Sequence, residues 1–293
     1  NNNFGVFSLD GRWIASPTRQ AADIASLPEG ISLVSIWEAE SGQEVQRMAV
    51  AGDIVALAFN ADGQRVAAGT ASGLVQVGQI GSRRPLADLY HDGPITALAF
   101  SPDGQLAASS SQDGVVKIWK AATGEVVAQL THPRVQELTF SPDGQQVYSI
   151  SWGGLLIASN PLTGATISQY HLPSESSYFI VFSPDGRWLA TGDGPVVQIW
   201  DLTTGQEVAH KTNDSGYSIL SVAFSPDGRW VAYGNWFEQV RVWLWHPDDL
   251  IDQACSRLSR NLSQAEWETY FPPGMPYHQT CPNLPPGDGA EEN

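Results

Sequence analysis

Short runs in which hydrophobic and polar residues alternate recur along the chain and stop at turn-forming residues. The clearest run is Ile-Thr-Ala-Leu-Ala-Phe at residues 95–100, which alternates with a period of two and ends at Ser-Pro-Asp-Gly. Pro at the second position and Gly at the last are typical of a tight turn. Similar runs follow at residues 106–111, 115–119 and 125–130, separated by Asp-Gly and Thr-Gly. We therefore predict four short antiparallel strands joined by turns.

This strand and turn pattern repeats along most of the chain. Phe-Ser-Pro-Asp-Gly begins at four positions and looser copies begin at two more, namely Phe100, Phe140, Phe182, Phe224, and Phe7 and Phe59. Successive copies lie 52, 41, 40, 42 and 42 residues apart. A period of about 40 residues indicates an array of equivalent units, and four strands per unit are typical of a β-propeller blade. We predict an all-β propeller with six recognisable blades over residues 1–245 and a C-terminal tail over residues 246–293.

Composition supports this fold and narrows the possible partners. Gly and Pro together occupy 47 of 293 positions, as expected for many short strands joined by turns. The chain carries 15 Lys and Arg against 31 Asp and Glu, a net charge of −16. Because such a surface repels phosphate backbones, we expect no nucleic-acid partner. No apolar run reaches the roughly 18 residues that a membrane span needs, so we expect no membrane association.

One copy carries the sequence hallmarks of a known family. Residues 182–190 read Phe-Ser-Pro-Asp-Gly-Arg-Trp-Leu-Ala, and Ile-Trp-Asp follows at residues 199–201. The chain resembles the WD-repeat β-propellers in a bacterial version, over nearly its whole length to about Trp245. The tryptophan of the family recurs in four copies, whereas Gly78 and Ser159 replace it in the second and fourth; the four are Trp37, Trp119, Trp200 and Trp243. The resemblance implies a propeller that binds other proteins.

The resemblance also implies a tetrad of hydrogen-bonded polar residues within a blade. Only the third copy matches it throughout, with His91, Ser109, Asp113 and Trp119. Such a chain of bonds would satisfy buried polar groups and lock the strands together, so we interpret His91 and Asp113 as structural. The fifth copy keeps Asp193 and Trp200, and the other copies should be held mainly by apolar packing.

The turns of a propeller fall on two opposite faces, and the less regular face is the one on which WD-repeat proteins most often bind. We predict a partner-binding rim there, composed of Trp152, Tyr178, Tyr217, Trp236, Phe237 and Arg134. Aromatic side chains anchor interfaces because they bury a large area at a low entropy cost. The alternative is local packing of these side chains over the blade ends. An insertion around residues 17–30 lies on the same face and is a further candidate for binding.

We expect a non-catalytic propeller that recognises a protein or peptide and uses no cofactor or metal. The sequence contains no phosphate-binding loop, no His-Glu-x-x-His, no paired-cysteine metal spacing and no nucleophile elbow. The alternative is a propeller enzyme or small-ligand binder at the central channel, to which only His91, His132 and His171 could contribute. A purely structural role as an oligomerisation platform is a third hypothesis.

The sixth copy lacks the fourth strand of its blade. We expect sequence upstream of this chain to supply that strand and a seventh blade; a closed ring of six blades is the alternative. Residues after Trp245 predict a helix with Leu250, Ala254 and Leu258 on one face. Ser263-Gln-Ala-Glu266 predicts a capping box that opens a second helix. Helices that cover a propeller edge are the expected role of the tail.

The tail resembles the C-terminal cap of large bacterial WD-repeat proteins, through Arg-Asn-Leu-Ser at residues 260–263 and Thr-Cys-Pro-Asn-Leu at residues 280–284. Upstream modules in those proteins are typically caspase-like proteases, STAND-type NTPases or protein kinases, which implies a sensor module in a larger signalling protein. The two cysteines, Cys255 and Cys281, suit a reducing cytoplasm, and a single bridge between them stays open.

Overall fold

The computed structural model describes residues 5–18, 28–172, 177–235, 239–270 and 281–285. The described strands form six antiparallel sheets, of which the first five have four strands and the sixth has three. The first sheet contains β1 (Val6–Phe7), β2 (Trp13–Thr18), β3 (Ile31–Glu38) and β4 (Glu44–Ala51). The second contains β5 (Ile54–Phe59), β6 (Arg65–Thr70), β7 (Leu74–Gln79) and β8 (Pro85–Tyr90). The third contains β9 (Ile95–Phe100), β10 (Leu106–Ser111), β11 (Val115–Lys120) and β12 (Val126–Thr131).

The remaining sheets follow the same order. The fourth contains β13 (Val135–Phe140), β14 (Val147–Ser151), β15 (Leu155–Ser159) and β16 (Thr166–His171). The fifth contains β17 (Ser177–Phe182), β18 (Trp188–Asp193), β19 (Val196–Asp201) and β20 (Gln206–Thr212). The sixth contains β21 (Ile219–Phe224), β22 (Trp230–Asn235) and β23 (Val240–Leu244). Each strand pairs with its sequence neighbour, so each sheet is a simple meander and one blade.

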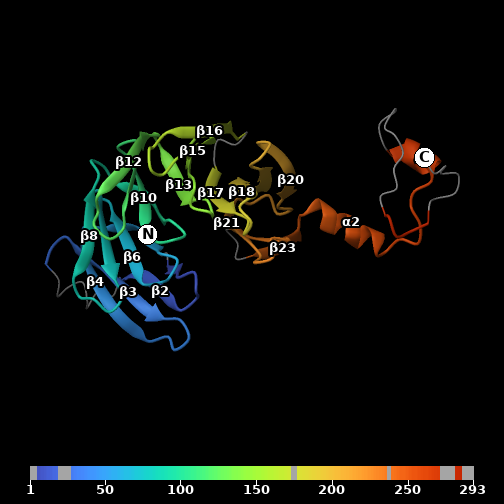
Figure 1. Cartoon of the computed structure of the whole chain (residues 1–293). Helices are drawn as coiled ribbons and strands as arrows, with labels where there is room; N and C mark the ends of the chain where they lie inside the picture. The colour runs from blue at the N-terminus through green and yellow to red at the C-terminus, as the bar shows by residue number, and fades with distance from the viewer. Residues whose placement is uncertain (1–4, 19–27, 173–176, 236–238, 271–280, 286–293) are drawn as a thin grey trace.

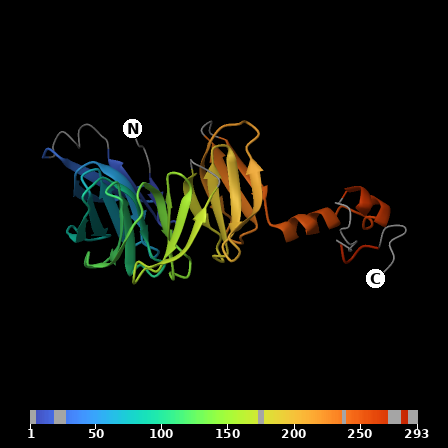
Figure 2. The ribbon, with the colours of Figure 1, turned by 90° about the horizontal axis from the view of Figure 1, so that it is seen from above.

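The blades pack face to face in an open arc (Figures 1 and 2). The first strand of each blade contacts the first strand of the next, from β1 through β5, β9, β13 and β17 to β21. The first and sixth blades lie at opposite ends of the arc, so the six do not close into a ring. The core therefore consists of apolar layers between adjacent blades. Between the third and fourth blades, Ala108 and Ile118 pack in one cluster with Leu138 and Phe140.

The Ser-Pro-Asp-Gly sequence is used in the same way in four blades. In the third blade the hydroxyl of Ser101 donates to Asp103 at 2.6 Å and accepts the backbone N–H of Leu106 at 2.9 Å. Asp103 in turn accepts the N–H of Gln105 at 3.0 Å, and Gly104 has a φ of 66° that disfavours a side chain. The serines of the next three blades make the same bonds to their aspartates. These aspartates are therefore turn-forming residues.

The sixth blade exposes a face that is buried in every other blade. The register of the strand pairs makes Val240 equivalent to Val116, and Val242 equivalent to Ile118. Val116 and Ile118 are fully buried against the fourth blade, whereas Val240 and Val242 are 75% and 63% exposed. At the other end of the arc, Phe7 is 67% exposed. Both ends therefore present apolar surface of the type that packs between blades.

The tail contains α2 (Pro247–Cys255) and α3 (Gln264–Tyr270). In both views α2 leads away from the sixth blade, so the described tail does not cover its open edge, in contrast to the expected role (Figures 1 and 2). Leu250 and Leu258, expected on an apolar helix face, are exposed. The predicted capping box is present: Ser263 N–H donates to Glu266 at 2.8 Å, and Glu266 N–H donates to the Ser263 hydroxyl at 3.3 Å.

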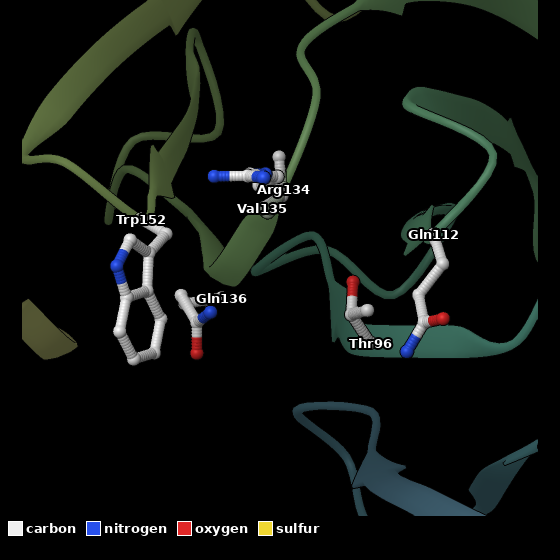
Figure 3. A pocket seen from close by; sticks show the side chains of 6 residues that line it. All are labelled: Thr96, Gln112, Arg134, Val135, Gln136 and Trp152. Carbon is white, nitrogen blue, oxygen red and sulfur yellow. The ribbon is translucent and has the colours of Figure 1, made fainter.

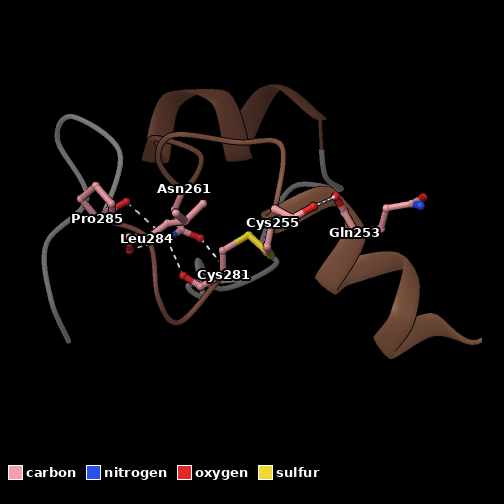
Figure 4. Close-up of a disulfide and its surroundings, with 7 residues drawn as sticks. Gln253, Cys255, Asn261, Cys281, Leu284 and Pro285 are labelled. Carbon is pink, nitrogen blue, oxygen red and sulfur yellow. Dashed lines mark hydrogen bonds between the residues drawn. A yellow bond between two sulfur atoms is a disulfide. The ribbon is translucent and has the colours of Figure 1, made fainter.

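The two cysteines form a disulfide, with a Cα–Cα distance of 5.5 Å (Figure 4). The side chain of Asn261 organises the chain around it. Its amide N–H donates to the carbonyls of Cys281 and Leu284 at 2.9 Å, and its Oδ1 accepts the N–H of Cys281 at 2.8 Å. Of the two possibilities left open by the sequence, the structure contains the bridge.

Candidate functional site

The four predicted tetrad residues lie in one chain of hydrogen bonds in the third blade. His91 Nε2 and Ser109 Oγ are 2.8 Å apart, and Trp119 Nε1 donates to the same Oγ at 3.2 Å. His91 Nδ1 lies 3.2 Å from Asp113 Oδ2. Burial lowers the pKa of His91, against the opposing effect of Asp113, so the ring is neutral at pH 7. A neutral ring that donates from Nδ1 and accepts at Nε2 fits these contacts.

The fourth blade contains a partial tetrad that the sequence analysis did not identify. His132 Nδ1 lies 2.7 Å from the Ser149 hydroxyl, and the residue is 1% exposed. Burial lowers the pKa of His132 to about 4, so this ring is also neutral at pH 7. Ser159 occupies the tryptophan slot, and neither its hydroxyl nor His132 Nε2 has a hydrogen-bond partner within the described structure. The position of His132, one repeat after His91, was the signal available in the sequence.

These bonds bear directly on the channel hypothesis. His91 and His132 are buried inside their blades and bonded to serines, so neither projects to the channel mouth. His171 is exposed at the end of the outer strand β16. Within the described residues no three His, Cys, Asp or Glu side chains are grouped so that they could hold a metal ion.

Two of the predicted rim residues meet in one pocket. Arg134 and Trp152 line a pocket of about 460 Å³ between the third and fourth blades, together with Thr96, Gln112, Val135 and Gln136. In Figure 3 the guanidinium of Arg134 extends toward the side of the pocket that carries Trp152 and Gln136, and Thr96 and Gln112 lie on the opposite side. Trp152 is 49% exposed, and Val135 is buried.

Two of the residues that line this pocket differ from their counterparts in the third blade. The backbone N–H of Gln112 donates to the carbonyl of Pro94 in the third blade, and that of Trp152 donates to Arg134 at 3.0 Å in the fourth. Trp152 thus replaces Gln112, and Arg134 replaces Pro94. Arg134 also has a φ of 61°, the one positive value at a non-glycine residue in the described chain. Non-glycine residues seldom adopt this conformation, and such outliers cluster at functional sites.

Of the other predicted rim residues, only Tyr217 has a side chain that the structure describes, and it does not line this pocket. Tyr217 is 47% exposed and precedes β21, two blades further along the arc. Tyr178 lies in β17, where the structure does not describe its side chain. Trp236 and Phe237 lie outside the described residues, and so does most of the insertion around residues 17–30.

A second pocket, of about 610 Å³, lies on the opposite face between the fifth and sixth blades and α2. Its lining residues make contacts within the chain: Arg229 contacts Asp249 of α2 at 2.6 Å, and the ring of Trp188 meets that of Trp245, just before α2, edge to face at 5.3 Å. The Trp245 indole also donates to the carbonyl of Gly228 at 2.9 Å. These contacts hold α2 to the propeller, so we interpret this pocket as a structural junction.

The comparisons with known proteins agree with the architecture. Residues 19–177, more than half of the chain, match the family model described as nucleolar protein 10-like, N-terminal domain. Residues 169–201 and 206–244 each match the WD domain, G-beta repeat. The chain belongs to this family of WD-repeat β-propellers. No curated protein shows significant similarity to it.

Membership in the family carries a general expectation about function. WD-repeat propellers generally mediate interactions between proteins and are typically non-enzymatic scaffolds. Within the described part of this WD-repeat propeller, neither helix has the length and apolarity that crossing a membrane requires.

Proposed function

We propose that this WD-repeat propeller is a non-catalytic recognition module that binds a protein or peptide segment in the pocket containing Arg134 and Trp152. The observation that carries the proposal is the convergence of these two side chains at a place where the repeat pattern is broken. At the same positions the second blade has Asp53 and Ala71, and the third has Pro94 and Gln112. In the sixth copy Trp236 stands at the position of Trp152 in the sequence, but Ser218 stands at that of Arg134. A rigid blade pair thus supports a local, irregular surface, which is the usual arrangement for binding.

The chemistry of the pocket suits a peptide side chain. The exposed indole of Trp152 offers a flat apolar surface, the guanidinium of Arg134 offers hydrogen-bond donors, and the amide of Gln136 can donate or accept. Trp and Arg are enriched among the residues that dominate binding energy, and truncation of such a residue typically costs 2 kcal/mol or more, so loss of Trp152 should weaken binding by roughly 30-fold.

An array of synthetic octapeptides of varied sequence, each with a free and with an amidated C terminus, tests the proposal. We expect a subset of peptides to bind the wild-type protein and to lose binding to Trp152→Ala. The matched control is Leu162→Ala, because Leu162 is 63% exposed in a turn on the opposite face of the same blade. A subset that binds all three proteins equally, or no bound peptide at all, would overturn the proposal.

We further propose that the propeller is the sensor or regulatory module of a larger bacterial signalling protein. The resemblance of the tail supports this context, and the exposed apolar faces at Phe7 and Val240 support contact with further blades or domains of the same polypeptide. In the intact protein these faces should be protected. Hydrogen exchange of β23 in this chain and in the full-length protein tests this, and equal exchange in the two would contradict it.

The cytoplasmic location remains part of the proposal, and the disulfide makes it testable. Persistent structural disulfides form in oxidising compartments and are rare in the cytoplasm. In a cytoplasmic protein Cys255 and Cys281 should therefore be reduced. Alkylation of free thiols in intact cells, followed by mass spectrometry, tests this expectation. Alkylated cysteines would support a cytoplasmic location, and an intact bridge would contradict it.

A further inference from the structure

The charge of the recognition pocket is unbalanced. Arg134 is the one charged residue among the six that line it. Its guanidinium is exposed and forms no ion pair with any described residue. Some described arginines pair with carboxylates, as Arg187 does with Asp201 and Arg229 with Asp249. Others, such as Arg65, form no ion pair with a described residue but do not line this pocket. What distinguishes Arg134 is that its unpaired guanidinium lines a pocket, where its N–H groups are available to a ligand.

The groups around Arg134 define the shape of that ligand. A guanidinium presents a planar fork of N–H donors that matches the two oxygens of a carboxylate. The amide of Gln136, on the side of the pocket toward which the guanidinium extends, can donate to the same anion. The half-exposed indole of Trp152 adds apolar surface to the same pocket, so an apolar side chain can pack there while the anion reaches the guanidinium.

The charge of the anion can also be argued. A phosphate carries nearly two negative charges at pH 7 and is usually held by several cationic groups, whereas the described lining of this pocket has one cation. The net charge of −16 also disfavours a ligand with many acidic residues. A single carboxylate among neutral residues fits both conditions.

We infer that the pocket selects peptides that carry one carboxylate beside an apolar residue, supplied either by an Asp or Glu side chain or by a free C terminus. This inference rests on the proposed function, because it assigns the ligand class of the same pocket. It goes further in that it makes Arg134 the residue that determines specificity and Trp152 the residue that provides affinity.

The test uses the octapeptide array together with two substitutions at position 134. Arg134→Asn removes the charge and suits the positive φ, which Asn tolerates better than most residues. Arg134→Lys keeps the charge but lacks the planar fork. For the wild type we expect an exchange of the carboxylate for an amide in the peptide (Glu to Gln, or a free to an amidated C terminus) to weaken binding roughly tenfold or more. For Arg134→Asn we expect the same exchange to have no effect, and for Arg134→Lys an intermediate effect.

The outcomes separate the inference from the proposed function. If the wild type binds neutral peptides as well as acidic ones and Trp152→Ala still abolishes binding, the carboxylate assignment is wrong and the recognition function stands. If no peptide depends on Trp152, both fail. Binding of a phosphoserine version of the best peptide more tightly than its Glu version would also overturn the carboxylate assignment. Free and amidated termini show which source supplies the carboxylate.

Discussion

The exposed face of the sixth blade can be tested with a pair of equivalent valines. Val116 and Val240 occupy the same position of the third strand in two blades, but one is fully buried and the other is 75% exposed. Replacing Val116 by Ala removes two buried methyl groups and leaves a cavity. At about 0.8 kcal/mol per carbon, plus a cavity penalty, we expect the free energy of unfolding to fall by about 2 kcal/mol. Val240→Ala should change it by less than about 0.5 kcal/mol.

Equilibrium unfolding in urea, followed by tryptophan fluorescence, measures both changes in the same chain. Measurements at several protein concentrations show whether association contributes. An open arc predicts the large difference between the two variants at every concentration. If Val240→Ala costs as much as Val116→Ala, the face of the sixth blade is covered in solution. The arrangement of blades described above would then be incomplete.

Three further predictions concern the tetrad, a partly buried acid and the tail. Ser109→Ala leaves His91 Nε2 and Trp119 Nε1 without their shared partner and should lower the free energy of unfolding by about 2–3 kcal/mol. Ser110→Ala is the comparison: it breaks a single bond, to the Thr96 hydroxyl, and should cost less. Equal costs in urea unfolding would refute the structural role of the tetrad. Burial raises the pKa of Glu137 to about 7, above its unfolded value, so folding should weaken as pH rises from about 4.5 to 7 and then level off. Glu137→Gln should therefore be more stable than the wild type by up to about 3 kcal/mol at pH 8 and not at pH 4.5, and a difference independent of pH would contradict this. The disulfide joins cysteines 26 residues apart, and closing such a loop should stabilise the folded tail by roughly 3–4 kcal/mol. Reduction, or the double variant Cys255→Ser and Cys281→Ser, should make the peptide bonds after Arg257 and Arg260 sensitive to trypsin without changing the unfolding of the blades. Unchanged resistance to trypsin would refute the dependence of the tail on the bridge.

Local sequence chemistry made the blades predictable. The Ser-Pro-Asp-Gly turns are held by hydrogen bonds between residues two to five positions apart, so the local sequence specifies their geometry. The runs of alternating hydrophobic and polar residues between the turns specify the strands. The capping box of α3 is equally local, since Ser263 and Glu266 are three residues apart. Family resemblance added the tetrad, whose members His91 and Trp119 are brought together by strand pairing.

Features that depend on packing between distant segments could not be derived in the same way. The apolar pattern after Trp245 suggested one covered helix face, yet α2 ends at Cys255, before Leu258, and both Leu250 and Leu258 are exposed. Periodicity indicates a face but not whether anything covers it. The partner of His132 was missed because Ser159 has replaced the tryptophan that marks the motif. For the rim, the sequence predicted Arg134 and Trp152 as separate residues, and only the geometry of two neighbouring blades places them in one pocket.

The central claim is that this pocket is where the propeller binds a peptide. Its most direct test is a titration of the best array peptide followed through the indole ¹H–¹⁵N signals, with the Trp152 signal assigned from its loss in Trp152→Ala. We predict that the Trp152 signal shifts and saturates with the peptide, while the signals of the buried Trp119 and Trp245 stay in place. Peptide binding that leaves the Trp152 signal unchanged would contradict the claim.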